Sequence, residues 1–99
     1  MTIRVDPERN EIYALKQVAD WRGKRLIELG CGDGRLTLRL ASLGPRSIRA
    51  LDPGRDLVRL ARQNLPEKYA GMVRYKVGSA LDLKYPDGTF DLAVFSWVL

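Results

Sequence analysis

Residues 26–34, Leu-Ile-Glu-Leu-Gly-Cys-Gly-Asp-Gly, constrain the fold more than any other part of the chain. An apolar stretch with strand character leads directly into three glycines at alternate positions, and a helical pattern of leucines follows. Open α/β sheets use a strand that ends in a glycine loop and continues as a helix to bring backbone close to a ligand. Glycine permits that approach because it accepts positive φ and has no Cβ. The segment therefore predicts a ligand site at the end of a buried strand.

The glycine spacing and a nearby acid narrow the chemistry of that ligand. A dinucleotide loop, Gly-x-Gly-x-x-Gly, would place its third glycine at position 35, where this chain has Arg35. A P-loop requires Gly-Lys-Ser/Thr after four intervening residues, and no such sequence follows. Glu28, two positions before the first glycine, would repel a pyrophosphate. The loop therefore favours a ligand with an ammonium or sulfonium centre.

A second acid stands at the position expected for a ribose contact. Residues 47–51, Ser-Ile-Arg-Ala-Leu, predict a short strand that ends at Asp52. This aspartate follows Gly32 by about 20 residues, where nucleotide-binding sheets place an acid for the ribose hydroxyls. A carboxylate can accept hydrogen bonds from both cis hydroxyls.

Together these segments resemble the class I S-adenosylmethionine-dependent methyltransferases, especially the type-11 group. Glu28–Gly34 is similar to the first motif of that family, Leu51-Asp52 to the acidic end of its second strand, and Gly78–Ser96 to its adenine-side loop and fourth strand. The resemblance implies S-adenosyl-L-methionine as cofactor, S-adenosyl-L-homocysteine as product, and methyl transfer to an acceptor that the sequence does not identify.

The resemblance also implies which residues contact the cofactor. Glu28 and the glycine loop would hold the methionine portion, Asp52 the ribose, and the segment after Gly78 the adenine. Ser79 departs from the family pattern, because many relatives carry an acid there. The full implied set is Glu28, Gly30, Cys31, Gly32, Gly34, Asp52, Pro53, Ser79, Ala80 and Ser96. The sequence does not identify a catalytic residue, and no metal site is expected. In methyl transfer the sulfonium carries its own activation, so the enzyme mainly positions the acceptor.

The expected fold is α/β, a Rossmann-like open parallel sheet truncated after the fourth strand. Right-handed crossovers give the strand order 3-2-1-4. Residues 1–99 are expected to form a single truncated cofactor-binding domain, with a helix at about 7–20 before the sheet. The other expected elements are strands at 26–29, 47–51, 73–77 and 91–99, and helices at 34–43 and 55–65. The second of these helices would turn Leu57, Leu60 and Ala61 inward.

The apolar fourth strand predicts a homodimer, because its outer edge would otherwise be left unpaired. No apolar stretch is long enough to span a bilayer, so no membrane partner is expected. The single cysteine, Cys31, suits a reducing cytoplasm, and the chain has no histidine to activate it. The net charge is +5, but the basic residues are spread along the sequence, so nucleic acid is not expected as a partner.

Two other functions remain open. A binding-only or vestigial module would keep the cofactor site without transferring a methyl group. A nicotinamide oxidoreductase would share the sheet and the acidic residue, although Arg35 at the third glycine position argues against it.

Overall fold

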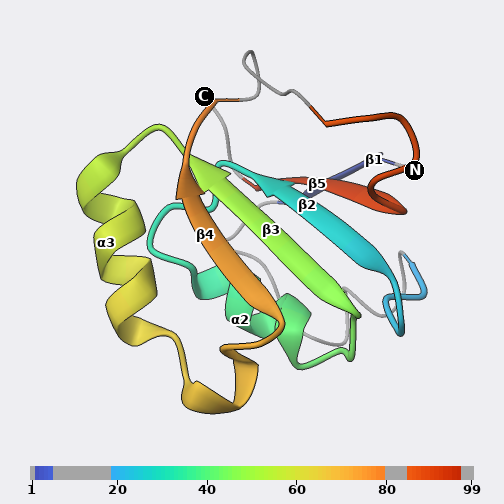
Figure 1. Cartoon of the computed structure of the whole chain (residues 1–99), viewed down its shortest axis with the longest axis horizontal. Coiled ribbons are helices and arrows are strands. Elements are labelled where there is room, and N and C mark those ends of the chain that lie inside the picture. Colours follow the sequence, from blue (N-terminus) through green and yellow to red (C-terminus); the bar gives the residue numbers. More distant parts are fainter. Residues whose placement is uncertain (1, 6–18, 80–84, 97–99) are drawn as a thin grey trace.

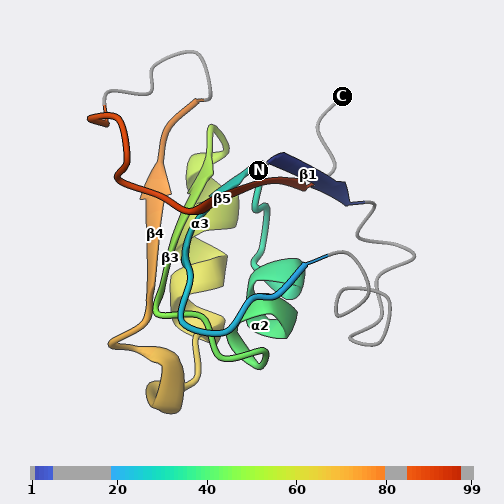
Figure 2. The same ribbon diagram turned by 90° about the vertical axis from the view of Figure 1, so that its right-hand side faces the viewer.

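The computed structural model describes residues 2–5, 19–79 and 85–96, which form an open sheet with two α-helices on one face (Figures 1 and 2). The strands are β1 (Thr2–Val5), β2 (Arg25–Leu29), β3 (Ser47–Asp52), β4 (Val73–Val77) and β5 (Leu92–Ser96). The helices are α2 (Arg35–Ala41) and α3 (Arg55–Asn64), and a short 3-10 turn, η2 (Glu67–Tyr69), precedes β4.

The strand order is β1-β5-β2-β3-β4, and every adjacent pair is parallel. Four of these strands, in the order β4-β3-β2-β5, are the predicted 3-2-1-4 sheet, which is confirmed. Parallel strands buried on both faces are rich in apolar residues, as β2 and β5 are. Because β2 and β3 pair in parallel, their carboxyl ends lie side by side at one edge of the sheet.

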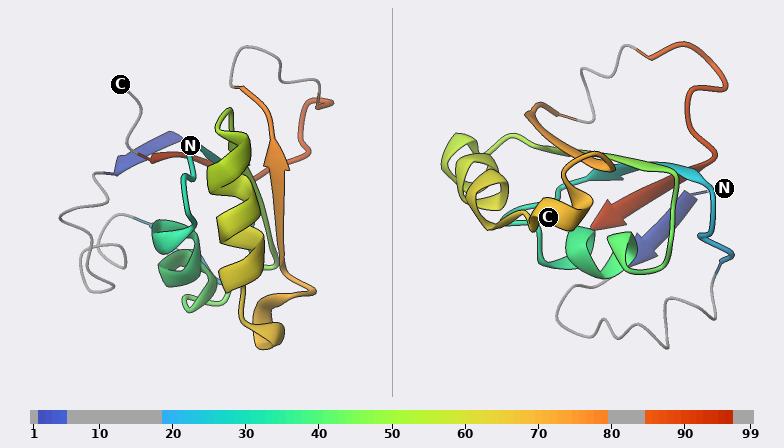
Figure 3. Two further views of the ribbon diagram at one scale, coloured as in Figure 1. Left: turned by 90° about the vertical axis from the view of Figure 1, so that its left-hand side faces the viewer. Right: turned by 60° about the horizontal axis from the view of Figure 1, so that its bottom comes forward.

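The prediction that the outer edge of the fourth strand is unpaired was wrong. Strand β1 pairs along it, with Thr2 opposite Ala93 and Val5 opposite Ser96 (Figure 3, right). The predicted homodimer through this edge therefore loses the unpaired strand that motivated it. A four-residue strand is too short to show a clear period, and its pairing depends on tertiary context.

Parts of two predicted elements lie outside the described residues. The predicted helix at 7–20 falls almost wholly there, and its last two residues, which are described, are not helical. Residues 97–99 of the predicted fourth strand also lie outside the described residues.

Side chains pack on both faces of the sheet. On the helix side, α2 buries Leu36 and Leu40 as predicted, and Leu43 is partly buried against the same core. On the other side, a smaller cluster joins Ile27, Leu29 and Leu51 to partly buried aromatic residues of the loop before β5. That loop lies across the sheet face opposite the helices (Figure 2). Part of this second face is therefore covered by the loop.

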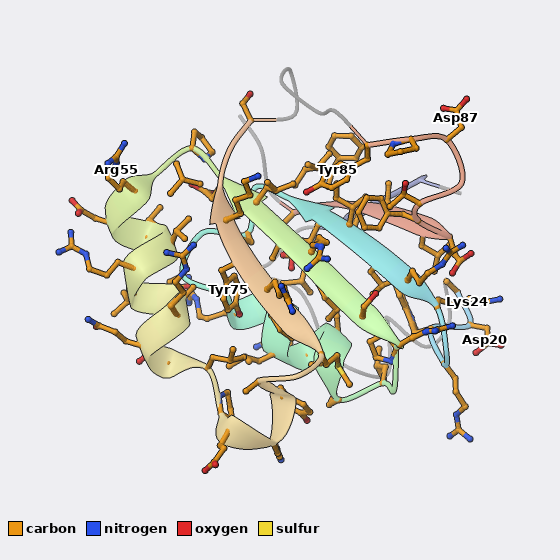
Figure 4. All side chains as sticks on the ribbon, in the orientation of Figure 1. Asp20, Lys24, Arg55, Tyr75, Tyr85 and Asp87 are labelled. Carbon is orange, nitrogen blue, oxygen red and sulfur yellow. The ribbon has the colours of Figure 1, made fainter. Side chains whose placement is uncertain are left out.

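The predicted inward face of α3 was partly wrong. Leu57 and Leu60 are 44% and 42% exposed, whereas Val58 and Ala61 are buried. Val58 and Ala61 of α3 and its C-cap residue Leu65 form the face that packs on the core. Their spacing fits one side of a helix as well as the spacing of Leu57 and Leu60 does, so the sequence pattern alone did not decide between the two faces. Small residues suit this face because α3 packs beside the bulky Tyr75 of β4 (Figure 4).

Candidate cofactor site

Asp52 ties together the two loops that follow β2 and β3. Its Oδ2 accepts a hydrogen bond from the Gly32 N–H at 2.9 Å, and its Oδ1 accepts one from the Gly54 N–H at 2.7 Å. The carbonyl oxygen of Leu51 accepts from the N–H groups of Gly30 and Cys31 at 2.8 and 3.0 Å. Each carboxylate oxygen keeps a lone pair beyond the one used here, so Asp52 can still accept hydrogen bonds from a ligand.

Two of the loop glycines are required for different reasons. Gly32 has a φ of +56°, and a Cβ built there would meet no atom within 4 Å. Gly34 has a φ of +91°, and its Cβ would lie 2.5 Å from the Tyr75 hydroxyl oxygen and 3.3 Å from the Ala61 Cβ. Gly34 therefore allows the loop to pack against β4 and α3. Gly32 instead leaves open space where a ligand can approach the backbone.

A cleft of about 310 Å³ lies at this edge of the sheet. Its volume falls at the lower end of the range for small-molecule sites, ~300–1,000 Å³. Five of the predicted site residues line it, and four further residues complete it. The full lining is Gly30, Cys31, Gly32, Asp33, Arg35, Leu36, Asp52, Leu57 and Ser96.

Glu28 lies beneath the cleft rather than in its wall. It is fully buried, and the hydroxyls of Thr37 and Ser96 each donate to one of its carboxyl oxygens at 2.5 Å. Burial raises the pKa of Glu28, the two hydroxyl donors lower it, and the nearby Asp52 charge raises it further. Because Ser96 also lines the cleft, it connects the buried carboxyl group to whatever occupies that space.

Cys31 is not set up as a nucleophile. Its side chain is 5% exposed, and the thiol contacts the Gly32 carbonyl oxygen at 3.8 Å. Burial, aided by the charges of Glu28 and Asp52, raises the pKa of this thiol far above its ordinary value. The thiolate is therefore disfavoured, so Cys31 fills space in the tight glycine loop rather than acting as a nucleophile.

The remaining predicted residues lie around the cleft or outside the described part of the chain. Pro53 is exposed in the turn after Asp52. Ser79 is half-buried and follows Gly78, whose N–H donates to the Asp52 backbone carbonyl at 3.0 Å. Ala80 lies outside the described residues. The cleft lining thus excludes Glu28, Gly34, Pro53 and Ser79.

Two residues important to the site escaped the sequence prediction. Thr37 was hidden among the leucines of α2, although a buried polar residue on the inner face of a helix needs a partner. Leu57 was assigned to the core but lines the cleft from the first turn of α3.

The described residues contain no group of three or more acidic, histidine or cysteine side chains that could hold a metal ion. In the same part of the chain, no helix is long and apolar enough to cross a membrane.

The chain folds as an α/β sheet with a cleft at the carboxyl ends of adjacent parallel strands, where such folds bind their ligands. Comparison with known families makes the class specific. The model of the methyltransferase-domain family matches residues 26–99, so the chain belongs to that family.

Individual relatives agree with this assignment. The chain is 26% identical over 98 residues to the ribosomal protein arginine N-methyltransferase rmt3 of Schizosaccharomyces pombe. The match covers 98% of this chain and 18% of that protein. It is 26% identical over 87 residues to a demethylmenaquinone methyltransferase of a Geobacillus species, covering 86% of this chain and 37% of the relative. The crystal structure of an S-adenosylmethionine-dependent methyltransferase from Mesorhizobium loti superposes with a TM-score of 0.74 at 25% identity. That match covers 88% of this chain and 37% of the other. The chain thus spans less than half the length of these relatives.

Proposed function

We propose that these residues form the cofactor-binding part of an S-adenosylmethionine-dependent methyltransferase. The observation that carries the proposal is the Asp52 carboxylate, which fastens the glycine loop to the next loop while keeping lone pairs for a ligand. Membership of the methyltransferase-domain family supports it. The cofactor would supply a methyl group bound to a positively charged sulfur.

The geometry of the cleft fits this cofactor. Gly32 leaves open space against the backbone, as a close-approaching methionine portion requires. Asp52 would accept hydrogen bonds from the ribose hydroxyls. Leu36 and Leu57 add apolar walls that exclude water from part of the cleft. Ser79 and Ala80, which follow β4, would flank the adenine.

The acidic surroundings of the cleft favour a cationic ligand. Asp33 and Asp52 line the cleft, and Glu28 lies buried behind Ser96. Arg35 also lines the cleft, but it forms an ion pair with Asp33 at 3.4 Å, so Asp52 and Glu28 are the acids left to face a ligand. A bound ammonium or sulfonium group would stabilise the ionised form of Glu28, which burial alone disfavours. We therefore assign Glu28 to positioning: it orients Ser96 and places negative charge behind the cleft.

The acceptor is not part of the proposal. Two relatives with the same 26% identity to this chain are named for different methyl acceptors. One name gives an arginine of a ribosomal protein, and the other gives demethylmenaquinone. A cytoplasmic location is proposed because Cys31 is a buried free thiol.

Titration calorimetry with S-adenosylhomocysteine, S-adenosylmethionine and NAD tests the proposal. Binding of the first two without NAD supports the cofactor assignment, whereas NAD binding alone would favour the oxidoreductase alternative. Methyl transfer from labelled S-adenosylmethionine to a panel of acceptors then separates an enzyme from a binding-only module. Absence of binding to all three ligands would refute the assignment of the cleft.

A further inference from the structure

A second hollow lies on the sheet face opposite the helices, over β3 and β4. It has a volume of about 500 Å³. Its floor belongs to the two strands, and Tyr85, from the loop before β5, forms one wall. The lining residues are Arg49, Ala50, Leu51, Arg62, Arg74, Tyr75, Lys76 and Tyr85. We call this hollow the basic groove.

Strand register brings the cations of the basic groove together. Arg49 of β3 is the direct partner of Arg74 of β4, so the two side chains emerge from the same face at neighbouring positions. Lys76 follows Arg74 by two residues and emerges on that face as well, ~6.6 Å further along the strand. On its other side, Arg49 is paired with Ile27, which is apolar. Charges that are spread along the sequence therefore gather in the fold.

The described lining of the basic groove holds no acid that would neutralise these charges. Among the described arginines, Arg25, Arg35 and Arg59 form ion pairs with acids, and none of these three lines the groove. Arg62 reaches from α3 to donate to the Tyr75 carbonyl oxygen at 2.8 Å, which adds a further cation at the outer edge. Like charges directly opposite each other destabilise a sheet. A bound anion would offset that cost.

We propose that the basic groove binds the phosphodiester backbone of single-stranded nucleic acid. Arginine forks match phosphate oxygens in a bidentate geometry, and two of them face the same space here. The half-buried Tyr85 ring stands at the wall, edge-on to Phe90 with ring centroids 4.9 Å apart. Figure 4 shows Tyr85 at the carboxyl end of the sheet, above the strands that carry the cations. A positively charged groove beside an aromatic side chain is how proteins hold single strands without reading their sequence.

The basic groove and the cofactor cleft are separate sites. Leu51 lines the groove, and the next residue, Asp52, lines the cleft, so a strand in the groove would run past the cofactor edge. The inference does not depend on the proposed methyltransferase activity, since no residue of the groove lining belongs to the cleft lining.

Fluorescence anisotropy with labelled 12-nucleotide oligouridine and oligodeoxythymidine tests the proposal on the purified chain. Arg49, Arg74 and Lys76 supply three phosphate contacts, while Arg62 is engaged by the Tyr75 carbonyl oxygen. Three contacts predict that log K falls with log salt concentration at a slope of roughly −2 for a single strand. The double variant Arg49→Gln/Arg74→Gln should bind at least tenfold more weakly at low salt and show a slope of about −0.7. Tyr85→Leu keeps an apolar side chain in the loop and should weaken binding at least fivefold.

The matched control is Arg22→Gln/Arg46→Gln, which removes the same charge from exposed positions outside the groove. This control should lose less than threefold in affinity. The groove variant should also unfold at a higher urea concentration than the parent, because it relieves the Arg49–Arg74 repulsion. The single variants Arg49→Gln and Arg74→Gln provide the same comparison if the double variant does not fold.

Three results would overturn the proposal. The parent chain could fail to bind either oligonucleotide at 50 mM salt, or the groove and control variants could lose affinity equally. Poly-glutamate could also displace oligouridine at the same charge concentration, which would identify an acidic polypeptide as the occupant. S-adenosylhomocysteine binding is measured on the same groove variant. Binding equal to that of the parent would show that the cofactor cleft is intact, so a failure of the groove proposal would leave the cofactor assignment standing.

Discussion

Replacing Asp52 with asparagine should destabilise the two loops at the carboxyl ends of β2 and β3, because the Asp52 carboxylate accepts a backbone hydrogen bond from each of them. Its two oxygens accept N–H groups from Gly32 and Gly54, which belong to different loops. Asparagine has only one acceptor oxygen. Whichever way the amide is turned, its NH₂ group faces one of the two backbone N–H donors.

The expected loss of unfolding free energy can be worked out from these two bonds. A hydrogen bond to a charged group is worth roughly 1.5–3 kcal/mol, and a neutral one roughly 0.5–1.5 kcal/mol. Asp52→Asn removes one charged bond and converts the other to a neutral one. The sum is about 2–4 kcal/mol for a side chain that is almost fully buried.

Urea unfolding measures this loss. With a slope of about 1–3 kcal/mol/M, the midpoint should fall by roughly 1–2 M. Asp56→Asn is a suitable control, because Asp56 lies in the first turn of α3, pairs with Arg59 on the surface and is 89% exposed. That variant should stay within ~0.5 kcal/mol of the parent. An unchanged midpoint for Asp52→Asn would refute the structural role given to the carboxylate.

Three smaller predictions concern the neighbouring parts of the fold. Gly34→Ala should destabilise the chain by about 2–4 kcal/mol in urea unfolding, because the methyl group meets Tyr75 at a positive φ, and Tyr75→Phe should restore part of the loss. Burial raises the pKa of Glu28, so its contribution to stability is greatest below the unfolded pKa of ~4.3 and falls as the pH rises above it. The stability of Glu28→Gln relative to the parent should therefore improve by up to ~1.4 kcal/mol per pH unit above pH 5, and a difference that is constant with pH would contradict this. Arg25 lowers the pKa of Asp91 to about 2, so the advantage of the parent over Asp91→Asn in thermal unfolding should shrink as the pH falls from 4 to 2.

The local pattern of the sequence was sufficient to predict the centre of the sheet and the outline of the site. The apolar run into Gly30 required a strand before a loop, and the acid at the end of the next strand had to reach the same edge because parallel strands end together. The presence of Asp52, Gly32 and Ser96 at one cleft follows from that topology.

What the sequence could not predict depends on contacts between distant residues. The pairing of β1 with β5 joins segments about 90 residues apart, and a four-residue strand carries no period of its own. Arg49 and Arg74 are separated by a whole helix, so only the strand register shows that they face each other. Glu28 was expected to meet a ligand directly, whereas the structure gives its two oxygens to hydroxyl groups from α2 and β5.

The central claim, that the glycine loop contacts S-adenosylmethionine, is tested most directly by placing asparagine at Gly32. Asparagine tolerates positive φ better than most residues, and the structure leaves open space at the Gly32 Cβ, so folding should be preserved. Gly23→Asn is the matched control, because Gly23 has a φ of +71° and equally open surroundings but does not line the cleft. Calorimetry with S-adenosylhomocysteine should show parent-like binding for Gly23→Asn and a loss of at least tenfold for Gly32→Asn, with both variants unfolding near the parent temperature. Equal affinity in the two folded variants would contradict contact between the loop and the cofactor.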